Sequence, residues 1–213
     1  MHDTSMLGGS LFGKVYGKEG MKVLDVGGAD VFGSLREPLQ KEGLEYISID
    51  IEQGKGVDIV YKPGDPFPFP DGHFDLIVTT SCFEHDPCFW MTFREMGRVL
   101  KQDGYIYMNA PSQGYYHGFP GDNWRFYSDA GQALAYWSGI VVDGTCYPVT
   151  VEETFHIMPL KDIWIDFVCV WRRFDKKEDT ILVSDEIRNK HGPLQLALHE
   201  AGATTVDRFR GAW

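Results

Sequence analysis

The stretch MKVLDVGGADVFGS, residues 21–34, decides the predicted fold. An apolar run over residues 23–26 leads into Gly27 and Gly28, and a helix is predicted to begin at Ser34. A buried strand, a tight glycine turn and a helix in this order form the unit that brings backbone N–H groups close to a nucleotide-like ligand. We therefore expect a ligand-binding strand–turn–helix unit here.

A second marker lies about 20 residues beyond the glycines, where folds of this kind place an acidic residue for a ribose. The segment YISIDI, residues 46–51, is predicted to be another buried strand, and Asp50 lies near its end. A carboxylate there can accept hydrogen bonds from both hydroxyls of a ribose. An adenosine-containing ligand is therefore the first hypothesis.

Two other interpretations of the glycine turn stay open. A dinucleotide site needs the spacing G-x-G-x-x-G, but Ala29 and Asp30 stand where its second glycine would have to be. Asp30 would also lie close to a pyrophosphate. The remaining alternative is a strand–turn–helix unit that binds no ligand, and the correctly spaced Asp50 argues against it.

Composition limits the class of protein. The chain has 213 residues, 43% of them hydrophobic, which is enough for one domain with a substantial core. A net charge of −11 and a pI of about 5.0 argue against a nucleic-acid partner. No apolar run reaches the roughly 18 residues of a membrane span, the first ten residues do not resemble a secretory signal, and the four cysteines form no framework. We expect a reduced, cytoplasmic, single-domain protein over residues 1–213.

Strand-like and helix-like segments alternate along the chain, which predicts a mostly parallel sheet with helices on both faces. The predicted strands cover residues 22–26, 46–51, 57–61, 74–80, 105–109, 140–147 and 163–172. The predicted helices cover residues 34–42, 89–100, 129–137 and 185–200.

Several of these segments together resemble the class I S-adenosylmethionine-dependent methyltransferases. The matching stretches, in order, are VLDVGGADVFGS, YISIDIE, DPFPFPDGHFDLIVTTSCFEH and EMGRVLKQDGYIYMNAPS. They are most similar to the small-molecule branch, and PSQGYYHGFPGDNWRFYSDAG resembles bacterial sugar and surface-polymer methyltransferases. The resemblance covers about residues 20–175, and the tail, residues 176–213, stays unassigned.

The resemblance implies an α/β fold of Rossmann type: one doubly wound domain with a seven-stranded, mostly parallel sheet and one antiparallel strand near its end, here residues 163–172. It implies S-adenosylmethionine (SAM) as the cofactor. The implied cofactor-binding residues are Asp25, Gly27, Gly28 and Ala29 at the turn, Asp50 on the ribose, Ile51 beside the adenine, and Ser81 and Phe83 along the floor. Where the family often places an acidic residue for the adenine amine, this chain has Tyr61 and Lys62, and Asp65 is the nearest substitute.

His85 is the candidate catalytic residue, because it follows the predicted strand 74–80 at the edge where ligands bind. A histidine can accept a proton from a substrate hydroxyl or amine as the methyl group is transferred. The alternative is a histidine that only shapes the loop. Cys82, His85 and Cys88 have the spacing of half a zinc site, but three ligands are too few for a closed structural site, so no metal is predicted.

A glycine-rich loop over residues 115–127 is the candidate acceptor site. Its candidate substrate-binding residues are His117, Asp122, Trp124, Arg125 and Tyr127. An arginine can bind a carboxylate or phosphate, and aromatic rings can stack on a sugar. In the alternative, Trp124 and Phe126 only anchor the loop to the core, and Asp122 pairs with Arg125.

The resulting functional hypothesis is a SAM-dependent methyltransferase that acts on an oxygen or nitrogen of a small polar acceptor such as a sugar or a phosphorylated metabolite. The predicted partner is thus a small-molecule substrate, with neither nucleic acid nor membrane, and the sequence assigns no oligomeric state. Asn109-Ala110-Pro111-Ser112 has only a superficial likeness to the motif of enzymes that methylate adenine, because that motif follows the fourth strand. The alternative is a catalytically inactive module of the same fold that binds the cofactor or a partner.

Overall fold

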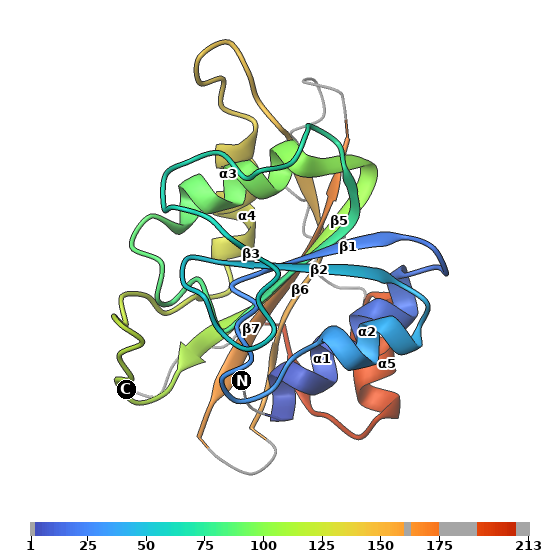
Figure 1. Ribbon diagram of the computed structural model, residues 1–213. Coiled ribbons are helices and arrows are strands. Elements are labelled where there is room, and N and C mark those ends of the chain that lie inside the picture. Colours follow the sequence, from blue (N-terminus) through green and yellow to red (C-terminus); the bar gives the residue numbers. More distant parts are fainter. Residues whose placement is uncertain (1–2, 160–162, 175–190, 208–213) are drawn as a thin grey trace.

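A computed structural model describes residues 3–159, 163–174 and 191–207 (Figure 1). Helices and strands alternate over most of the chain. The elements are α1 (Asp3–Tyr16), β1 (Lys22–Val26), α2 (Arg36–Lys41), β2 (Glu45–Asp50), β3 (Ile59–Val60), β4 (Phe74–Thr80), α3 (Phe89–Val99), β5 (Leu100–Gln113), α4 (Ala130–Ser138), β6 (Val149–Ile157), β7 (Ile165–Arg173), α5 (Pro193–Glu200) and β8 (Thr205–Val206).

The strands form one sheet with the order β3-β2-β1-β4-β5-β7-β6-β8. Neighbouring strands from β3 to β5 are parallel, and β7 is antiparallel to both β5 and β6. The predicted mostly parallel sheet and the antiparallel strand near residues 163–172 are therefore confirmed. The predicted number of seven strands is one too few, because β8 in the tail pairs with the far side of β6.

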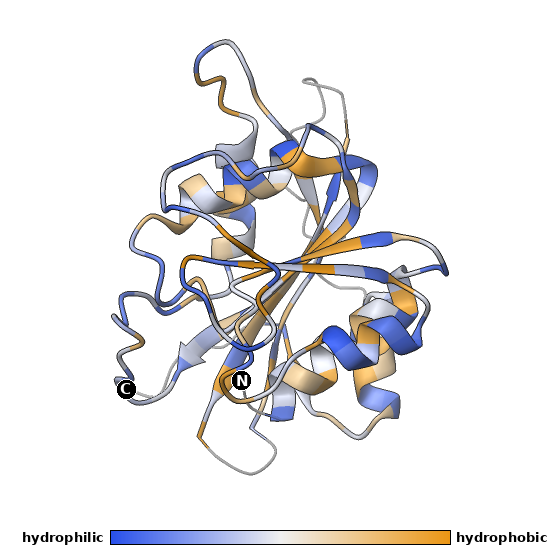
Figure 2. Cartoon of the chain, viewed as in Figure 1, coloured by the Kyte–Doolittle hydropathy of each residue, from blue (hydrophilic) through white to orange (hydrophobic). Residues whose placement is uncertain are grey.

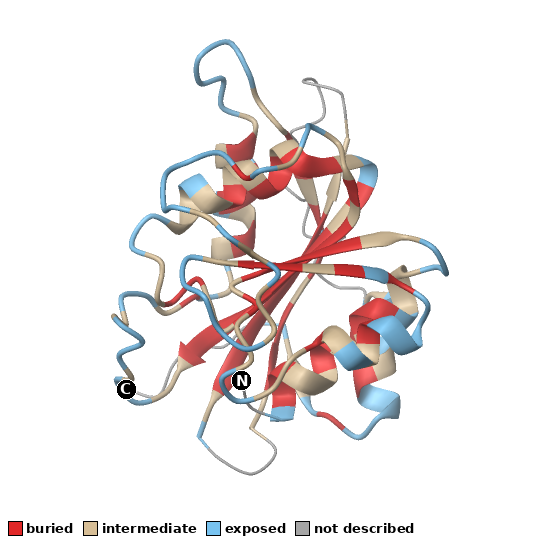
Figure 3. Cartoon of the chain, viewed as in Figure 1, coloured by how far each residue is buried: buried red, intermediate tan, exposed pale blue. Residues whose placement is uncertain are grey.

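Two hydrophobic cores lie on opposite faces of the sheet, because successive strand residues point to opposite sides. On β4, Ile77 packs in the core covered by α3 and α4, while Leu76 and Val78 pack in the core covered by α1, α2 and α5. Figure 1 shows these two helical layers on either side of the sheet. The central strands are apolar in Figure 2 and buried in Figure 3.

The structure differs from the predicted elements mainly between β5 and β7. Residues 140–147 do not form the predicted strand: Ile140, Val141 and Val142 are 40–50% exposed and precede a turn. The strand in this region is β6, which begins at Val149 and which the sequence analysis missed. Helix α1 was also missed, although Phe12 from it is fully buried. The first part of the predicted helix 185–200 lies outside the described residues.

The strand order indicates the edge of the sheet at which a ligand is expected to bind. Strand β1 lies between β2 and β4, so the strand order reverses there, and in open α/β sheets ligands bind at the carboxyl ends of the strands near such a point. Both the glycine turn and His85 follow strands that end at this edge. Among the described residues, no helix is long and apolar enough to cross a membrane.

Candidate active site

The glycine turn after β1 is closely packed. Gly27 has a φ of +76°, which is a left-handed conformation, and a Cβ on it would lie 2.3 Å from Sγ of Cys82. A Cβ on Gly28 would lie 2.3 Å from Oγ of Ser48 on β2. Both positions therefore require glycine, the first for its backbone conformation and both for lack of space.

The backbone N–H groups of the turn all donate hydrogen bonds within the chain. Those of Gly27 and Gly28 donate to the carbonyl of Ile49, at 2.9 and 3.2 Å, and that of Asp30 donates to Lys55 at 2.7 Å. That of Ala29 donates to Oδ2 of Asp50 at 3.1 Å. A pyrophosphate needs such groups as free donors, so the geometry argues against a dinucleotide and suits a ligand without phosphate.

Asp50 ends β2, directly beside the glycine turn. Besides Ala29, its carboxylate accepts the N–H of Ile51 through Oδ1 at 2.7 Å. Oδ1 also accepts the N–H of Glu52, in a longer bond of 3.4 Å. Each carboxylate oxygen has two lone pairs, so Oδ2 keeps one for a hydroxyl, and Oδ1 can take a second hydroxyl in place of the long bond to Glu52. The neighbouring Ile51 is 42% exposed and offers an apolar surface. These features match the chemistry predicted for a ribose and an adenine.

Asp25 lies beneath the turn. It is 1% exposed and accepts a hydrogen bond from the hydroxyl of Tyr46. Burial raises the pKa of Asp25 to about 6, and the Tyr46 hydroxyl opposes this shift. Its carboxyl carbon would be 3.0 Å from a Cβ on Gly28. The place of Asp25 is therefore that of a support below the predicted methionine site.

The floor of the predicted cofactor site follows β4 and includes the predicted residues Ser81 and Phe83. Ser81 has a φ of +49° and follows the strand directly, whereas Phe83 is 1% exposed and packs in the core against Phe89. Cys82 contacts the turn at Gly27, and the sequence analysis did not predict it as a cofactor-binding residue. Burial raises the pKa of its thiol, and the carboxylates of Glu84, Asp86 and Asp50 raise it further. Acidic groups therefore surround this part of the edge.

On the side predicted for the adenine, Asp65 and Tyr61 lie differently from expectation. Asp65 is exposed in the turn after β3, where its N–H donates to the carbonyl of Lys62. The pKa of Tyr61 is raised, first by burial and then by Cys82, Asp86 and Asp50. Tyr61 is thus the residue of this segment that lies near Asp50. Tyr61 stands where the family often has an acidic residue, and this position in the sequence could have identified it as a residue near Asp50.

The close packing of the turn leads to a testable result. Gly28→Ala is expected to destabilise the fold by about 2 kcal/mol, the typical cost of overpacking, because its Cβ would collide with the Ser48 hydroxyl. That hydroxyl is buried and has no hydrogen-bond partner within the described residues. Ser48→Ala is therefore expected to be nearly neutral alone and to restore most of the stability in the double variant.

Thermal unfolding of the four proteins measures this coupling. Gly54→Ala is a matched control, because the nearest atom to a Cβ there is 3.6 Å away. Additive effects of Gly28→Ala and Ser48→Ala would contradict the proposed collision.

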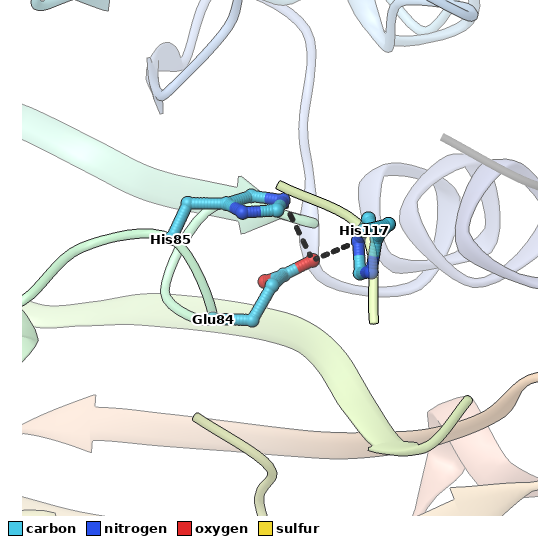
Figure 4. A group of neighbouring side chains, drawn as sticks. All are labelled: Glu84, His85 and His117. Atoms are coloured by element: carbon cyan, nitrogen blue, oxygen red, sulfur yellow. Dashed lines mark ion pairs between the residues drawn. The ribbon is translucent and has the colours of Figure 1, made fainter. Parts of the chain in front are cut away.

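His85 and His117 meet around the carboxylate of Glu84. Oε1 of Glu84 lies 3.7 Å from Nε2 of His85 and 4.0 Å from Nε2 of His117 (Figure 4). The two imidazole rings are 4.9 Å apart and nearly perpendicular. Burial lowers the pKa of His85, and the nearby His117 lowers it further, so His85 is mainly neutral at pH 7.

Glu84, directly before His85 in the sequence, is buried. It is 1% exposed, and its Oε2 atom has no hydrogen-bond partner within the described residues. Its pKa is raised to about 8, mainly by burial and also by the nearby Asp166, while Arg125 opposes the shift. A carboxylate this close to two imidazoles was signalled in the sequence only by the pair Glu84-His85.

The loop 115–127 is held against the residues that follow β4. The carbonyl of Glu84 accepts the N–H groups of Asn123 and Trp124, at 2.6 and 3.2 Å. The side chains of the same two residues donate to the carbonyls of His85 and Asp86, at 2.8 and 2.9 Å. The loop thereby brings His117 to His85, two residues that are distant in the sequence.

The other loop candidates have partners in the chain or are exposed. The guanidinium of Arg125 donates to both carboxylate oxygens of Asp122, at 2.5 and 2.8 Å, and to the carbonyl of Tyr115. Trp124 packs edge-on against Phe89 and Trp90. The ion pair and the anchoring considered as alternatives are therefore present. Tyr127 is 56% exposed and free to contact a ligand.

The C-x2-H-x2-C spacing does not assemble a metal site. In the part of the chain that the structure describes, one group of three or more potential ligands comes together, and its members are Glu84, His85 and His117. Cys82 contacts the glycine turn, and Cys88 is exposed just before α3.

Comparisons with known proteins agree with this fold. A family model described as a methyltransferase domain matches residues 10–156. No curated protein matches the sequence. Among solved structures, 1,6-didemethyltoxoflavin-N1-methyltransferase from Burkholderia thailandensis, with bound 1,6-didemethyltoxoflavin and S-adenosylhomocysteine, is similar with a TM-score of 0.60 at 13% identity, covering 80% of this chain and 79% of that one. A putative sarcosine dimethylglycine methyltransferase from Galdieria sulphuraria has a TM-score of 0.57 at 16% identity, covering 81% and 86%. At such identities these two likenesses establish the fold alone.

The chain belongs to the methyltransferase-domain family and is a class I SAM-dependent methyltransferase. SAM is its cofactor, as the resemblance implied. The residues present fit this cofactor. The N–H groups of the glycine turn are not free to bind a phosphate, and SAM contains no phosphate. The acidic groups around Cys82 suit the positive charge of the SAM sulfonium. The likeness to sugar and surface-polymer methyltransferases stays a prediction.

Proposed function

We propose that this enzyme methylates an oxygen or nitrogen of a small polar acceptor, and that His85 accepts the proton which the acceptor loses. The observation that carries the proposal is the position of Nε2 of His85, a basic atom at the carboxyl end of β4 beside the acidic surroundings of Cys82. A proton acceptor there would lie next to the predicted cofactor floor.

The assigned cofactor residues act by binding and orientation. In this proposal Asp50 binds the two ribose hydroxyls, Ile51 packs beside the adenine, and the glycine turn lies under the methionine part. SAM supplies an activated methyl group, so the main task of the chain is to align the acceptor with it. Good alignment of this kind can contribute roughly 7–11 kcal/mol, and a base a further factor of about 10²–10⁴.

The acceptor class follows from the loop 115–127. Tyr115, Tyr116, Phe119 and Tyr127 are 56–78% exposed, and aromatic faces of this kind suit the apolar faces of sugar rings. A phosphate would have to compete with Asp122 for Arg125, because that ion pair already uses the guanidinium. We therefore favour a sugar hydroxyl over a phosphorylated metabolite as the acceptor.

A two-stage experiment tests the proposal. Thermal unfolding with S-adenosylhomocysteine, NAD or ATP is expected to show stabilisation by the first alone, of about 2.7 kcal/mol at a hundredfold excess over Kd. Transfer of a labelled methyl group to a panel of sugars, phosphosugars and amino acids then identifies the acceptor class. Protein that binds S-adenosylhomocysteine but methylates only phosphosugars would contradict the preference for a neutral sugar.

A further inference from the structure

Three ligand atoms from two parts of the chain converge at one point. One ligand atom each from Glu84, His85 and His117 lies within 4.8 Å of the other two. Oε1 of Glu84 is 3.7 Å from Nε2 of His85 and 4.0 Å from Nε2 of His117. Figure 4 shows the two rings on either side of the carboxylate oxygen. Glu84 is 1% exposed, so bulk water cannot stabilise the ionised form of its carboxyl group, and a positive partner is needed for that form.

The hydrogen bonds of the two rings determine which nitrogens face inward as lone pairs. Nδ1 of His85 is bonded to the carbonyl of Gly121. Nδ1 of His117 lies 3.2 Å from the carbonyl of Tyr115 and 3.3 Å from Oδ2 of Asp122. These oxygens only accept, so Nδ1 carries the hydrogen in both rings. In a neutral imidazole Nε2 then has the lone pair.

When Glu84 is ionised, two imidazole lone pairs and a carboxylate oxygen therefore face each other, and all three are acceptors. A positive charge between them removes this conflict. A second, independent observation is the unpartnered Oε2 of the same buried carboxylate. We propose that Glu84, His85 and His117 form a binding site for a divalent transition-metal ion, with Gly121, Tyr115 and Asp122 orienting the two rings.

The geometry and the ligand types suit this class of ion. Zinc binds histidine nitrogen and carboxylate oxygen at about 2.0–2.2 Å, which places the ligand atoms of a tetrahedral site about 3.4 Å apart. The separations of 3.7 and 4.0 Å from Glu84 need only small side-chain rotations to reach this value. Histidines that bind metals usually donate their other N–H to a carbonyl or carboxylate, as both do here.

Three protein ligands leave an open position, as in catalytic rather than structural zinc sites. This part of the inference rests on the proposed function: the open position would take an oxygen of the acceptor. In the ion-bound protein His85 is then a ligand, whereas in the metal-free protein its Nε2 is the proton acceptor.

Calorimetric titration of metal-free protein with Zn²⁺ tests the site without measuring activity. We expect one ion per chain, bound at least a hundredfold more tightly than Mg²⁺, because imidazole ligands favour transition metals. Glu84→Gln, His85→Gln and His117→Gln are each expected to weaken zinc binding at least a hundredfold. His117 is 37% exposed, so His117→Gln should fold normally, and thermal unfolding checks all three variants.

Two matched controls exclude other sites. Cys88→Ser removes a cysteine of the C-x2-H-x2-C spacing, and His199→Gln removes one ring of a second histidine pair, whose other ring belongs to His191. Both are expected to keep wild-type affinity. The proposal would be overturned if a control variant lost zinc binding while His117→Gln kept it, or if the protein showed no preference for Zn²⁺ over Mg²⁺. A proton shared between the three groups would then be the remaining explanation of their arrangement. Zinc binding without methyl transfer would overturn the proposed acceptor function alone.

Discussion

Asp50→Ala is expected to weaken the binding of S-adenosylhomocysteine at least a hundredfold. Two charge-assisted hydrogen bonds to the ribose would be lost, each worth about 1.5–3 kcal/mol. The N–H groups of Ala29 and Ile51 would also lose their acceptor, so the turn would be less well held. Calorimetry with the purified variant measures the effect directly.

Glu52→Ala is the matched control for this experiment. It removes the same charge from an exposed residue two positions further on and is expected to leave the affinity within about twofold. Asp65→Ala separates the remaining assignment, because a loss there would restore Asp65 as the adenine contact. Unchanged affinity in Asp50→Ala would disprove the ribose assignment.

His85→Ala is expected to lower kcat by about 10²–10⁴-fold, the usual contribution of a general base, while the affinity for S-adenosylhomocysteine stays the same. The comparison is made in metal-free protein, so that loss of a base is measured apart from loss of an ion. Single-turnover methyl transfer to the acceptor found in the panel gives the rate, and calorimetry gives the affinity.

Cys88→Ser serves as the control for the same loop, since Cys88 is exposed and close to His85 in the sequence. Its kcat should equal that of the wild type. A His85→Ala variant with an undiminished kcat would show that this histidine only shapes the loop, through its contact with the carbonyl of Gly121.

Most of the fold followed from local patterns. Strand β4 has the predicted bounds of 74–80, and α3 differs from its predicted range only by its last residue, because dense apolar runs and a regular helical stripe identify such elements. Strand β6 was missed since Glu152 and Glu153 interrupt its apolar residues. The carboxylate of Glu153 is nevertheless buried, where it accepts the N–H groups of Leu194 and Gln195 at the start of α5. That tertiary contact has no local signal.

Only part of the candidate site could be predicted from the sequence. The positions of Gly27, Gly28 and Asp50 follow from the order of strands and turns, which fixes them at one edge. The approach of His117 to Glu84 depends on how a long loop folds back over the edge, and no spacing in the sequence reports it. The ion pair between Arg125 and Asp122 likewise depends on how the loop folds.

The hydrogen bonds between residues 84–86 and Asn123 and Trp124 have a consequence for the evolution of acceptor preference. Because the main chain and side chains of Asn123 and Trp124 hold the base of the loop, residues at its tip can change without loss of these hydrogen bonds. Tyr115, Tyr116 and Phe119 project from that tip with most of their surface exposed. In the proposed function these three residues contact the acceptor, so substitution there is expected to change the acceptor preference while His85 keeps its position.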